Sequence, residues 1–182
     1  MDEREFDSLL RKAKTPDRRV AWFGALLAKE SEVPVVIVGG SAIQVYTERA
    51  YVSHDIDIVG DRSKLAAVLR RWGFHREKGR SSRIYWVKEP LGLVDLVGVR
   101  MKSGLSPQTV QTPYGSVNLG PPEDLITRRL MRAGAEQSTD LFQEAVLIAH
   151  RYRDVLDWGY IRADAQYERV LPLYEQLRKL VA

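Results

Sequence analysis

Two short motifs, VVIVGGSA at residues 35–42 and SHDIDIV at residues 53–59, decide how the chain is expected to fold. The first begins with β-branched residues and contains two glycines, a pattern typical of a buried strand that turns into a helix. In the second, acidic and aliphatic residues alternate. Since alternate residues of a strand share a face, Asp55 and Asp57 are expected on one face, with the isoleucines pointing into the core.

Asp55 and Asp57 are candidate ligands for a divalent metal ion. Two neighbouring carboxylates repel each other, so a cation between them would stabilise both charges, and oxygen ligands on a rigid strand suit Mg²⁺. The polar face of an edge strand is the alternative explanation of an Asp-x-Asp pattern. The glycine-rich turn favours a site, because glycines let a phosphate approach the N–H groups of a helix start, where Ser41 adds a hydroxyl.

A third acidic residue, Asp95, lies within the apolar run LVDLV at residues 93–97. A charge inside a buried strand is costly without a partner, and a metal ion shared with Asp55 and Asp57 would account for it. The alternative is that Asp95 ends its strand and faces solvent.

These residues resemble the signature of a known family. Gly39-Gly40-Ser41, a helix, and then Ser53-x-Asp55-Ile56-Asp57-Ile58 resemble the nucleotidyltransferase superfamily with the polymerase-β-like fold. Within it, the sequence is most similar to small stand-alone prokaryotic members, including the toxins of AbiE-like toxin–antitoxin systems. The resemblance implies an α+β fold, in which a mixed sheet is flanked by helices and followed by a helical C-terminal part.

The resemblance also implies roles for individual residues. Catalytic and metal-binding roles fall to Asp55, Asp57 and Asp95, which would hold two Mg²⁺ ions, with Mn²⁺ as the alternative metal. Nucleotide-binding roles fall to Gly39, Gly40, Ser41 and Ser53.

Residues 122–130 resemble the family's second motif, a helix in which a basic residue faces the nucleotide. Arg129 matches that residue, which is usually lysine, and Asp140 matches the acid that follows, so both are expected to bind nucleotide. The match is incomplete, because the segment before Asp140 is longer than usual and Gln143 stands where a further acid is common. Arginine can grip a phosphate bidentately but cannot transfer a proton. A basic surface helix is the alternative.

Basic residues gather between the second and third candidate carboxylates of a chain whose net charge is +4. They are Arg62, Lys64, Arg70, Arg71, Arg76, Lys78, Arg80, Arg83 and Lys88. Such a stretch beside a metal site is suited to a triphosphate or a nucleic-acid backbone. A solvated surface of arginines is the alternative.

Composition and element order set the remaining expectations. The chain has 182 residues and no cysteine, which excludes disulfides and thiolate zinc sites and fits a cytoplasmic protein. It has no long apolar run or leader, so no membrane association is expected. Strands mixed with helices precede helices alone, which predicts a catalytic core with N-terminal helices over residues 1–120 and a helical part over 121–182.

Local signals predict several element boundaries. Thr15 before Pro16 predicts a helix start, and a helix is expected over residues 42–48. A turn at residues 88–92 predicts antiparallel pairing between a strand at residues 84–87 and the strand that bears Asp95.

These patterns predict an enzyme that moves a nucleoside monophosphate from an NTP such as ATP to a hydroxyl and releases pyrophosphate. Relatives use tRNA ends, protein side chains or small molecules such as aminoglycosides as acceptors, and tRNA or a protein is favoured here. A toxin role would bring an antitoxin protein as partner. The alternatives are a catalytically silent nucleotide- or RNA-binding protein of the same fold, and an α/β binding module whose Asp-x-Asp pattern is coincidental.

Overall fold

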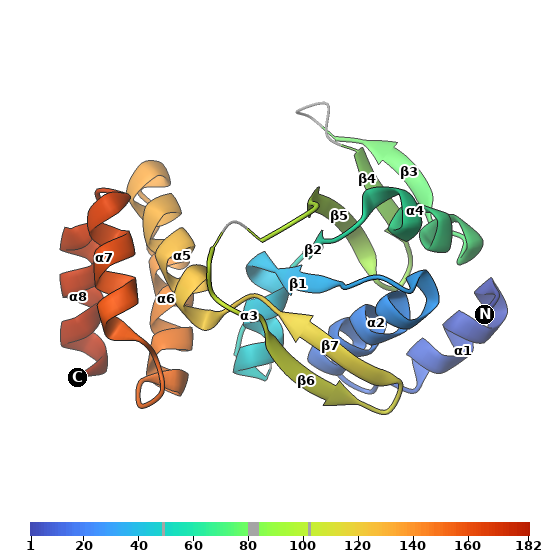
Figure 1. Ribbon diagram of the computed structural model, residues 1–182, viewed down its shortest axis with the longest axis horizontal. Helices are drawn as coiled ribbons and strands as arrows, with labels where there is room; N and C mark the ends of the chain where they lie inside the picture. The colour runs from blue at the N-terminus through green and yellow to red at the C-terminus, as the bar shows by residue number, and fades with distance from the viewer. Residues whose placement is uncertain (49, 80–83, 102) are drawn as a thin grey trace. The chain divides into compact units, whose positions relative to one another are not determined.

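The computed structural model describes residues 1–48, 50–79, 84–101 and 103–182, which divide into two compact units, Met1–Gly120 and Pro121–Ala182. In the first unit, seven strands form one mixed sheet in the order β3-β4-β5-β2-β1-β7-β6 (Figure 1). The strands are β1 (Val36–Val38), β2 (Asp55–Val59), β3 (His75–Lys78), β4 (Ile84–Lys88), β5 (Gly92–Gly98), β6 (Gln108–Thr112) and β7 (Gly115–Leu119). The sheet therefore places β2 and β5 side by side near its centre.

Both parallel and antiparallel pairs occur in the sheet. Strand β1 pairs antiparallel with β2 and parallel with β7, and β2 pairs parallel with β5. The antiparallel pairing of β4 with β5 confirms the prediction made from the turn at residues 88–92. The mixed sheet and its flanking helices confirm the expected α+β class.

Within the described residues of the first unit the helices are α1 (Glu3–Arg11), α2 (Pro16–Ser31), α3 (Gly39–Thr47) and α4 (Arg62–Arg71). As predicted, Thr15 caps α2, because its hydroxyl accepts a hydrogen bond from the N–H of Arg18. Helix α3 begins at Gly39 rather than at Ala42, where its start was expected. Gly39 has a φ of +63°, so the chain turns within that residue and the helix follows at once.

An aromatic cluster forms the core between the N-terminal helices and the end of α4. Phe6 stacks on Trp72 with ring centroids 4.1 Å apart, and Phe23 contacts both rings. Phe74 contacts Phe6 and Phe23. All four side chains are buried. Aromatic rings bury large apolar areas, so this cluster fixes the N-terminal helices on the rest of the unit.

The second unit contains four helices: α5 (Pro122–Glu136), α6 (Thr139–Tyr152), α7 (Trp158–Tyr167) and α8 (Leu171–Val181). They pack around buried aliphatic residues of all four, among them Leu130, Ile148, Ile161 and Leu177. No helix in the described parts of the chain is long and apolar enough to cross a membrane.

The aromatic core yields a stability prediction. Phe6→Ala removes a fully buried ring and leaves a cavity beside Trp72, so we expect the free energy of unfolding to fall by about 3–5 kcal/mol. Urea denaturation followed by tryptophan fluorescence measures this change. Val99→Ala, at a residue that is 64% exposed, serves as the control and should change stability by less than about 0.5 kcal/mol. Equal effects of the two substitutions would contradict the assignment of Phe6 to the core.

Candidate active site

The three candidate carboxylates lie on two neighbouring parallel strands. Asp55 and Asp57 are on β2, and the register of β2 against β5 pairs Asp57 with Asp95. Paired residues of neighbouring strands share a face of the sheet, as do alternate residues of one strand, so all three belong to one face. Asp95 is only 7% exposed, whereas Asp55 and Asp57 are half-buried. The tertiary fold therefore brings Asp95 next to Asp57 across 38 residues of sequence.

Gly39 leaves room for the carboxylate of Asp57. A Cβ atom at position 39 would collide with Oδ2 of Asp57, and the φ of +63° is one that L-residues rarely adopt. Only glycine therefore allows this carboxylate to lie against the backbone at the start of α3. The position of the Asp57 carboxylate thus explains why the first residue of the Gly-Gly-Ser motif is glycine.

Ser41 is fully buried and links three elements. Its hydroxyl donates a hydrogen bond to the carbonyl of Val38 at 3.0 Å and accepts one from the N–H of Asp57 at 3.3 Å. These bonds connect the end of β1, the first turn of α3 and the middle of β2. In the structure this hydroxyl holds the backbone of Asp57, and its predicted contact with a phosphate stays a prediction.

Gln44 is a site residue that the sequence analysis missed. It is buried, and its Oε1 accepts a hydrogen bond from the N–H of Ser53 at 2.7 Å, while the Ser53 hydroxyl donates to Oδ1 of Asp55 at 3.2 Å. Gln44 therefore anchors the segment that leads into β2. A signal was present in the sequence, because Gln44 follows Ser41 by three residues and so shares its side of an otherwise apolar helix.

The start of α3 offers backbone donors close to Asp57. Val38 occupies the N-cap and provides no side-chain hydrogen bond to the first turn, which contains Gly39 and Gly40. The first N–H groups of a helix lack partners within the helix and carry a partial positive charge, which favours anions. A phosphate-bearing ligand and the Asp57 carboxylate can therefore meet at this turn.

The carboxylates are only partly suited to a metal ion as they stand. Their oxygens are the ligands that Mg²⁺ prefers, and Asp57 and Asp95 are register neighbours. However, no three His, Cys, Asp or Glu side chains in the described residues are grouped closely enough to hold a metal ion. The donor chemistry of Asp57 and Asp95 fits a divalent ion, and Oδ1 of Asp55 accepts the hydrogen bond from the Ser53 hydroxyl.

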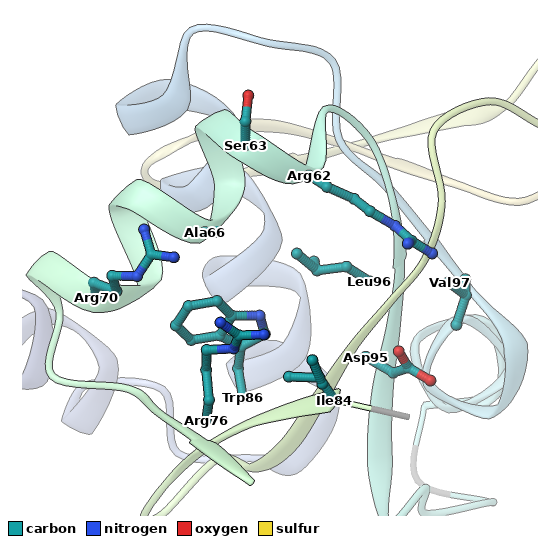
Figure 2. Close-up of a pocket in the computed structure, with 10 residues that line it drawn as sticks. All are labelled: Arg62, Ser63, Ala66, Arg70, Arg76, Ile84, Trp86, Asp95, Leu96 and Val97. Carbon is teal, nitrogen blue, oxygen red and sulfur yellow. The ribbon is translucent and has the colours of Figure 1, made fainter. Parts of the chain in front are cut away.

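The basic stretch divides into residues with different surroundings. Arg71 forms an ion pair with Glu30 at 2.7 Å, and Lys88 pairs with Glu3 and Asp7 of α1. Arg62, Arg70 and Arg76 instead line a pocket of about 690 Å³ (Figure 2). The rest of the pocket is lined by Ser63, Ala66, Ile84, Trp86, Asp95, Leu96 and Val97. Arg80 and Arg83 lie outside the described residues.

The second motif lies entirely in the helical unit, where Arg129 and Asp140 have different environments. Arg129 is 7% exposed, and its Nε lies 2.5 Å from Oε2 of Glu144, also buried, at ion-pair distance but without a well-directed hydrogen bond. Asp140 is exposed in the first turn of α6. Glu144 was not singled out from the sequence, and its contact with Arg129 shows one function of that arginine inside the unit.

A second buried acid in this unit, Asp124, accepts a hydrogen bond from the hydroxyl of Tyr160 at 2.9 Å. Burial, and then this hydrogen bond, raise the pKa of Tyr160 to about 12, so the phenol stays protonated at neutral pH. Both polar pairs join α5 to another helix of the same unit.

Structural comparison identifies the fold. No protein-family model matches the chain, and no curated protein matches it. Among solved structures, the antigenic nucleotidyltransferase-like protein from Paracoccidioides brasiliensis superposes with a TM-score of 0.61 at 15% identity, covering 92% of this chain and 94% of that one. The antibiotic-resistance factor ANT(2″)-Ia superposes in its solution structure with a TM-score of 0.53 at 19% identity, covering 87% of this chain and 93% of its own.

A crystal structure of ANT(2″)-Ia in complex with adenylyl-2″-tobramycin also superposes, with a TM-score of 0.50 at 18% identity, covering 88% of this chain and 97% of that one. These likenesses show a nucleotidyltransferase-like fold, which is the fold that the sequence resemblance implied. At these identities the likeness concerns the fold.

The contact between Gly39 and Asp57 yields a second prediction. Gly39→Ala should lower the free energy of unfolding by at least about 1–2 kcal/mol, because alanine is strained at this φ and its methyl group displaces the Asp57 carboxylate. Thermal and urea unfolding measure the loss. Gly104→Ala is the matched control, since a methyl group there meets no atom within 4 Å. A Gly39→Ala protein as stable as this control would show that the contact does not constrain the site.

The Arg129–Glu144 pair yields a third prediction. Arg129→Leu leaves Glu144 as a buried charge without its partner and should cost about 3–5 kcal/mol, whereas the double substitution Arg129→Leu/Glu144→Leu should restore most of that loss. A double-mutant cycle by urea denaturation measures the coupling. Arg132→Leu, which breaks the exposed pair with Glu136, should cost less than about 1 kcal/mol. Similar losses for Arg129→Leu and Arg132→Leu would contradict the prediction.

Proposed function

We propose that the chain is a metal-dependent nucleotidyltransferase, which moves a nucleoside monophosphate from an NTP to a hydroxyl and releases pyrophosphate. The observation that carries this proposal is the placement of Asp57, which lies beside Asp95 in register and against Gly39 at the start of α3. Carboxylates for a cation and backbone donors for a phosphate therefore occur together. The proposal assigns the catalytic unit to residues 1–120 and a supporting helical unit to residues 121–182.

The N–H groups of the first turn of α3, at Gly39 and Gly40, bind the phosphates of the donor in this proposal. Ser41 and Ser53 contribute by positioning the acids: the Ser41 hydroxyl accepts a hydrogen bond from the N–H of Asp57, and the Ser53 hydroxyl donates one to the carboxylate of Asp55. Asp57 and Asp95, with Asp55 beside them, would hold Mg²⁺, which neutralises the triphosphate and lowers the pKa of an acceptor hydroxyl when it is bound. Arg129 and Asp140 remain predicted nucleotide contacts.

The transfer itself needs one proton acceptor and one leaving group. The acceptor oxygen forms a bond to the α-phosphorus of the NTP, the bond from that phosphorus to the β-phosphate oxygen breaks, and pyrophosphate leaves with the bonding electrons. In this proposal Asp95 takes the hydroxyl proton. Two observations support the choice: Asp95 is the more buried member of the adjacent pair, and it lines the pocket described above. Positive charge near the leaving group would lower the barrier further.

The neighbours support this activity without defining the acceptor. ANT(2″)-Ia was solved with adenylyl-2″-tobramycin, so one protein of this fold is found with an adenylylated antibiotic. For the present chain we propose tRNA or a protein as acceptor, ATP among the donors, and action in the cytoplasm. A toxin role with an antitoxin partner, as in the AbiE-like proteins, is part of the same proposal.

A catalytically silent nucleotide- or RNA-binding protein is the second candidate. One observation favours it: no three acidic or histidine side chains in the described residues are grouped as a metal site. A protein that binds nucleotide through α3 and does not transfer it would need no such group.

Calorimetric titration separates the two candidates. Each NTP is titrated into the wild-type protein and into Asp57→Asn, with and without Mg²⁺. We expect Mg²⁺-dependent binding of at least one NTP to the wild type and a loss of at least about tenfold in Asp57→Asn, because the amide removes a charge that the metal requires. Asp154→Asn, at an acid whose side chain is 88% exposed, is the matched control and should bind like the wild type.

The opposite results are equally informative. NTP binding that does not depend on Mg²⁺ or on Asp57 would favour the silent protein. Failure of every NTP to bind in the presence of Mg²⁺ would reject the transferase and the silent nucleotide-binding protein, and would leave the silent RNA-binding protein. Where binding is found, incubation with labelled NTP and candidate acceptors then tests transfer directly.

A further inference from the structure

The pocket lined by Arg62, Arg70 and Arg76 lies where two strands of the sheet separate. Strands β4 and β5 pair from Lys88 with Gly92 as far as Trp86 with Val94, and their register ends there. Beyond that point β4 continues to pair with β3. The pocket contacts residues on both sides of the separation, namely Ile84 and Trp86 of β4 and Asp95 to Val97 of β5. It therefore extends from the face covered by α4 to the strand that carries Asp95.

Three guanidinium groups dominate the charge of this pocket. Arg62 and Arg70 lie at the two ends of α4, and Arg76 lies on β3, so the charge comes from two separate elements. All three side chains are exposed, and no acid in the described residues forms an ion pair with any of them. Arg71 and Lys88, by contrast, pair with acids of the N-terminal helices. The pocket therefore carries positive charge that these acids do not neutralise.

Trp86 holds two of these guanidinium groups in place. It is 5% exposed, and the guanidinium carbons of Arg70 and Arg76 lie 5.3 and 5.9 Å from its ring centroid. In Figure 2 the Arg76 side chain lies over this ring and Arg70 lies to its side on α4, while Arg62 extends toward Val97 of β5. Cation–π contacts of this kind orient an arginine without neutralising it, so its N–H donors remain available. The buried ring is a support for the arginines, and it is not exposed enough to stack on a base.

The position of the pocket in the sheet separates it from the expected donor site. The order of the strands is β4-β5-β2-β1, and α3 follows β1. Asp57 on β2 and Asp95 on β5 therefore lie between the start of α3 on one side and the pocket on the other. A donor whose phosphates are held by the first turn of α3 leaves the pocket for the second substrate, which must bring its hydroxyl to the carboxylates.

We propose that this pocket binds the backbone phosphates of a single-stranded RNA that serves as acceptor. The inference rests on the proposed transferase function, since it names the acceptor of that site. Three unneutralised arginines attract a polyanion and repel a polycationic small molecule, so they oppose an amine-rich acceptor. Guanidinium groups match phosphate oxygens in bidentate geometry, and a pocket of about 690 Å³ has room for more than a single phosphate.

The arrangement of charge along the pocket agrees with such an acceptor. Asp95 also lines the pocket, and a carboxylate repels phosphate but accepts a hydrogen bond from a hydroxyl. An RNA end carries both groups, with phosphates along the strand and hydroxyls at its terminus. The strand would thus place its phosphates at the arginines and its terminal hydroxyl toward Asp95.

Binding of an RNA strand can be tested without the transfer reaction. Fluorescence anisotropy is measured with a labelled oligouridylate of about ten nucleotides, in the absence of NTP and metal. We expect the wild-type chain of 182 residues to bind it with a salt-dependent affinity. Arg70→Gln/Arg76→Gln should weaken binding and reduce the slope of log affinity against log salt by about 0.7 for each phosphate contact that is lost. Arg62→Gln, which removes no contact with Trp86, should weaken binding in the same direction.

The matched control is Arg71→Gln, which removes the same charge from the neighbouring position of α4 but outside the pocket. It should reduce RNA affinity less than either pocket variant. Circular dichroism and thermal unfolding test whether the variants are folded. If the double variant is unstable, the Arg62→Gln variant still tests the pocket. Competition with polyglutamate of similar length distinguishes RNA from an acidic protein segment.

Four results would overturn the proposal: a wild type that does not bind the oligonucleotide, pocket variants that bind like the wild type, an Arg71→Gln variant that loses as much, or polyglutamate that competes as well as RNA. The calorimetric NTP titration, repeated on the pocket variants, adds a fifth. If these arginines were needed for NTP binding and not for RNA, the pocket would belong to the donor. RNA binding that depends on the pocket without any Mg²⁺-dependent NTP binding would instead reject the transferase and leave an RNA-binding site.

Discussion

The packing of Asp57 against Gly39 is the constraint on which the candidate site depends. Strand β2 lies between β1 and β5. Its middle residue, Asp57, lies close to the start of α3, which follows β1, and it pairs in register with the buried Asp95 of β5. The absence of a side chain at position 39 lets the carboxylate reach the backbone of the turn. A single residue thus joins a region suited to phosphate with a region suited to a cation.

Hydrogen bonds from two buried side chains of α3 maintain this arrangement. Ser41 and Gln44 lie three residues apart on α3 and bond to Asp57 and Ser53 at the middle and the entry of β2. A buried polar group that loses its partner costs about 1–3 kcal/mol, so each bond favours one register of β2 over its alternatives. Residues that resemble a phosphate-binding motif in sequence therefore also position the acid that the chemistry would use.

Groups that attract anions occur at two places in the first unit. Backbone donors at the start of α3 and the arginine pocket at β4 and β5 flank the carboxylates from opposite sides in the strand order. The fold is shared with nucleotidyltransferase-like proteins at low sequence identity, and a shared fold does not determine a ligand, so local charge is the more specific guide to what this chain binds.

The sequence by itself determined the class of fold and its candidate acids. Short-range patterns carry this information: the β-branched run before the two glycines, the alternation around Asp57, the turn before β5 and the cap at Thr15 all depend on neighbouring residues. Only the tertiary structure decided which distant residues meet. Asp57 pairs with Asp95, Arg129 with Glu144, and Trp86 orients Arg70 and Arg76, because sheet register and helix packing act between segments whose spacing in sequence does not reveal their contact.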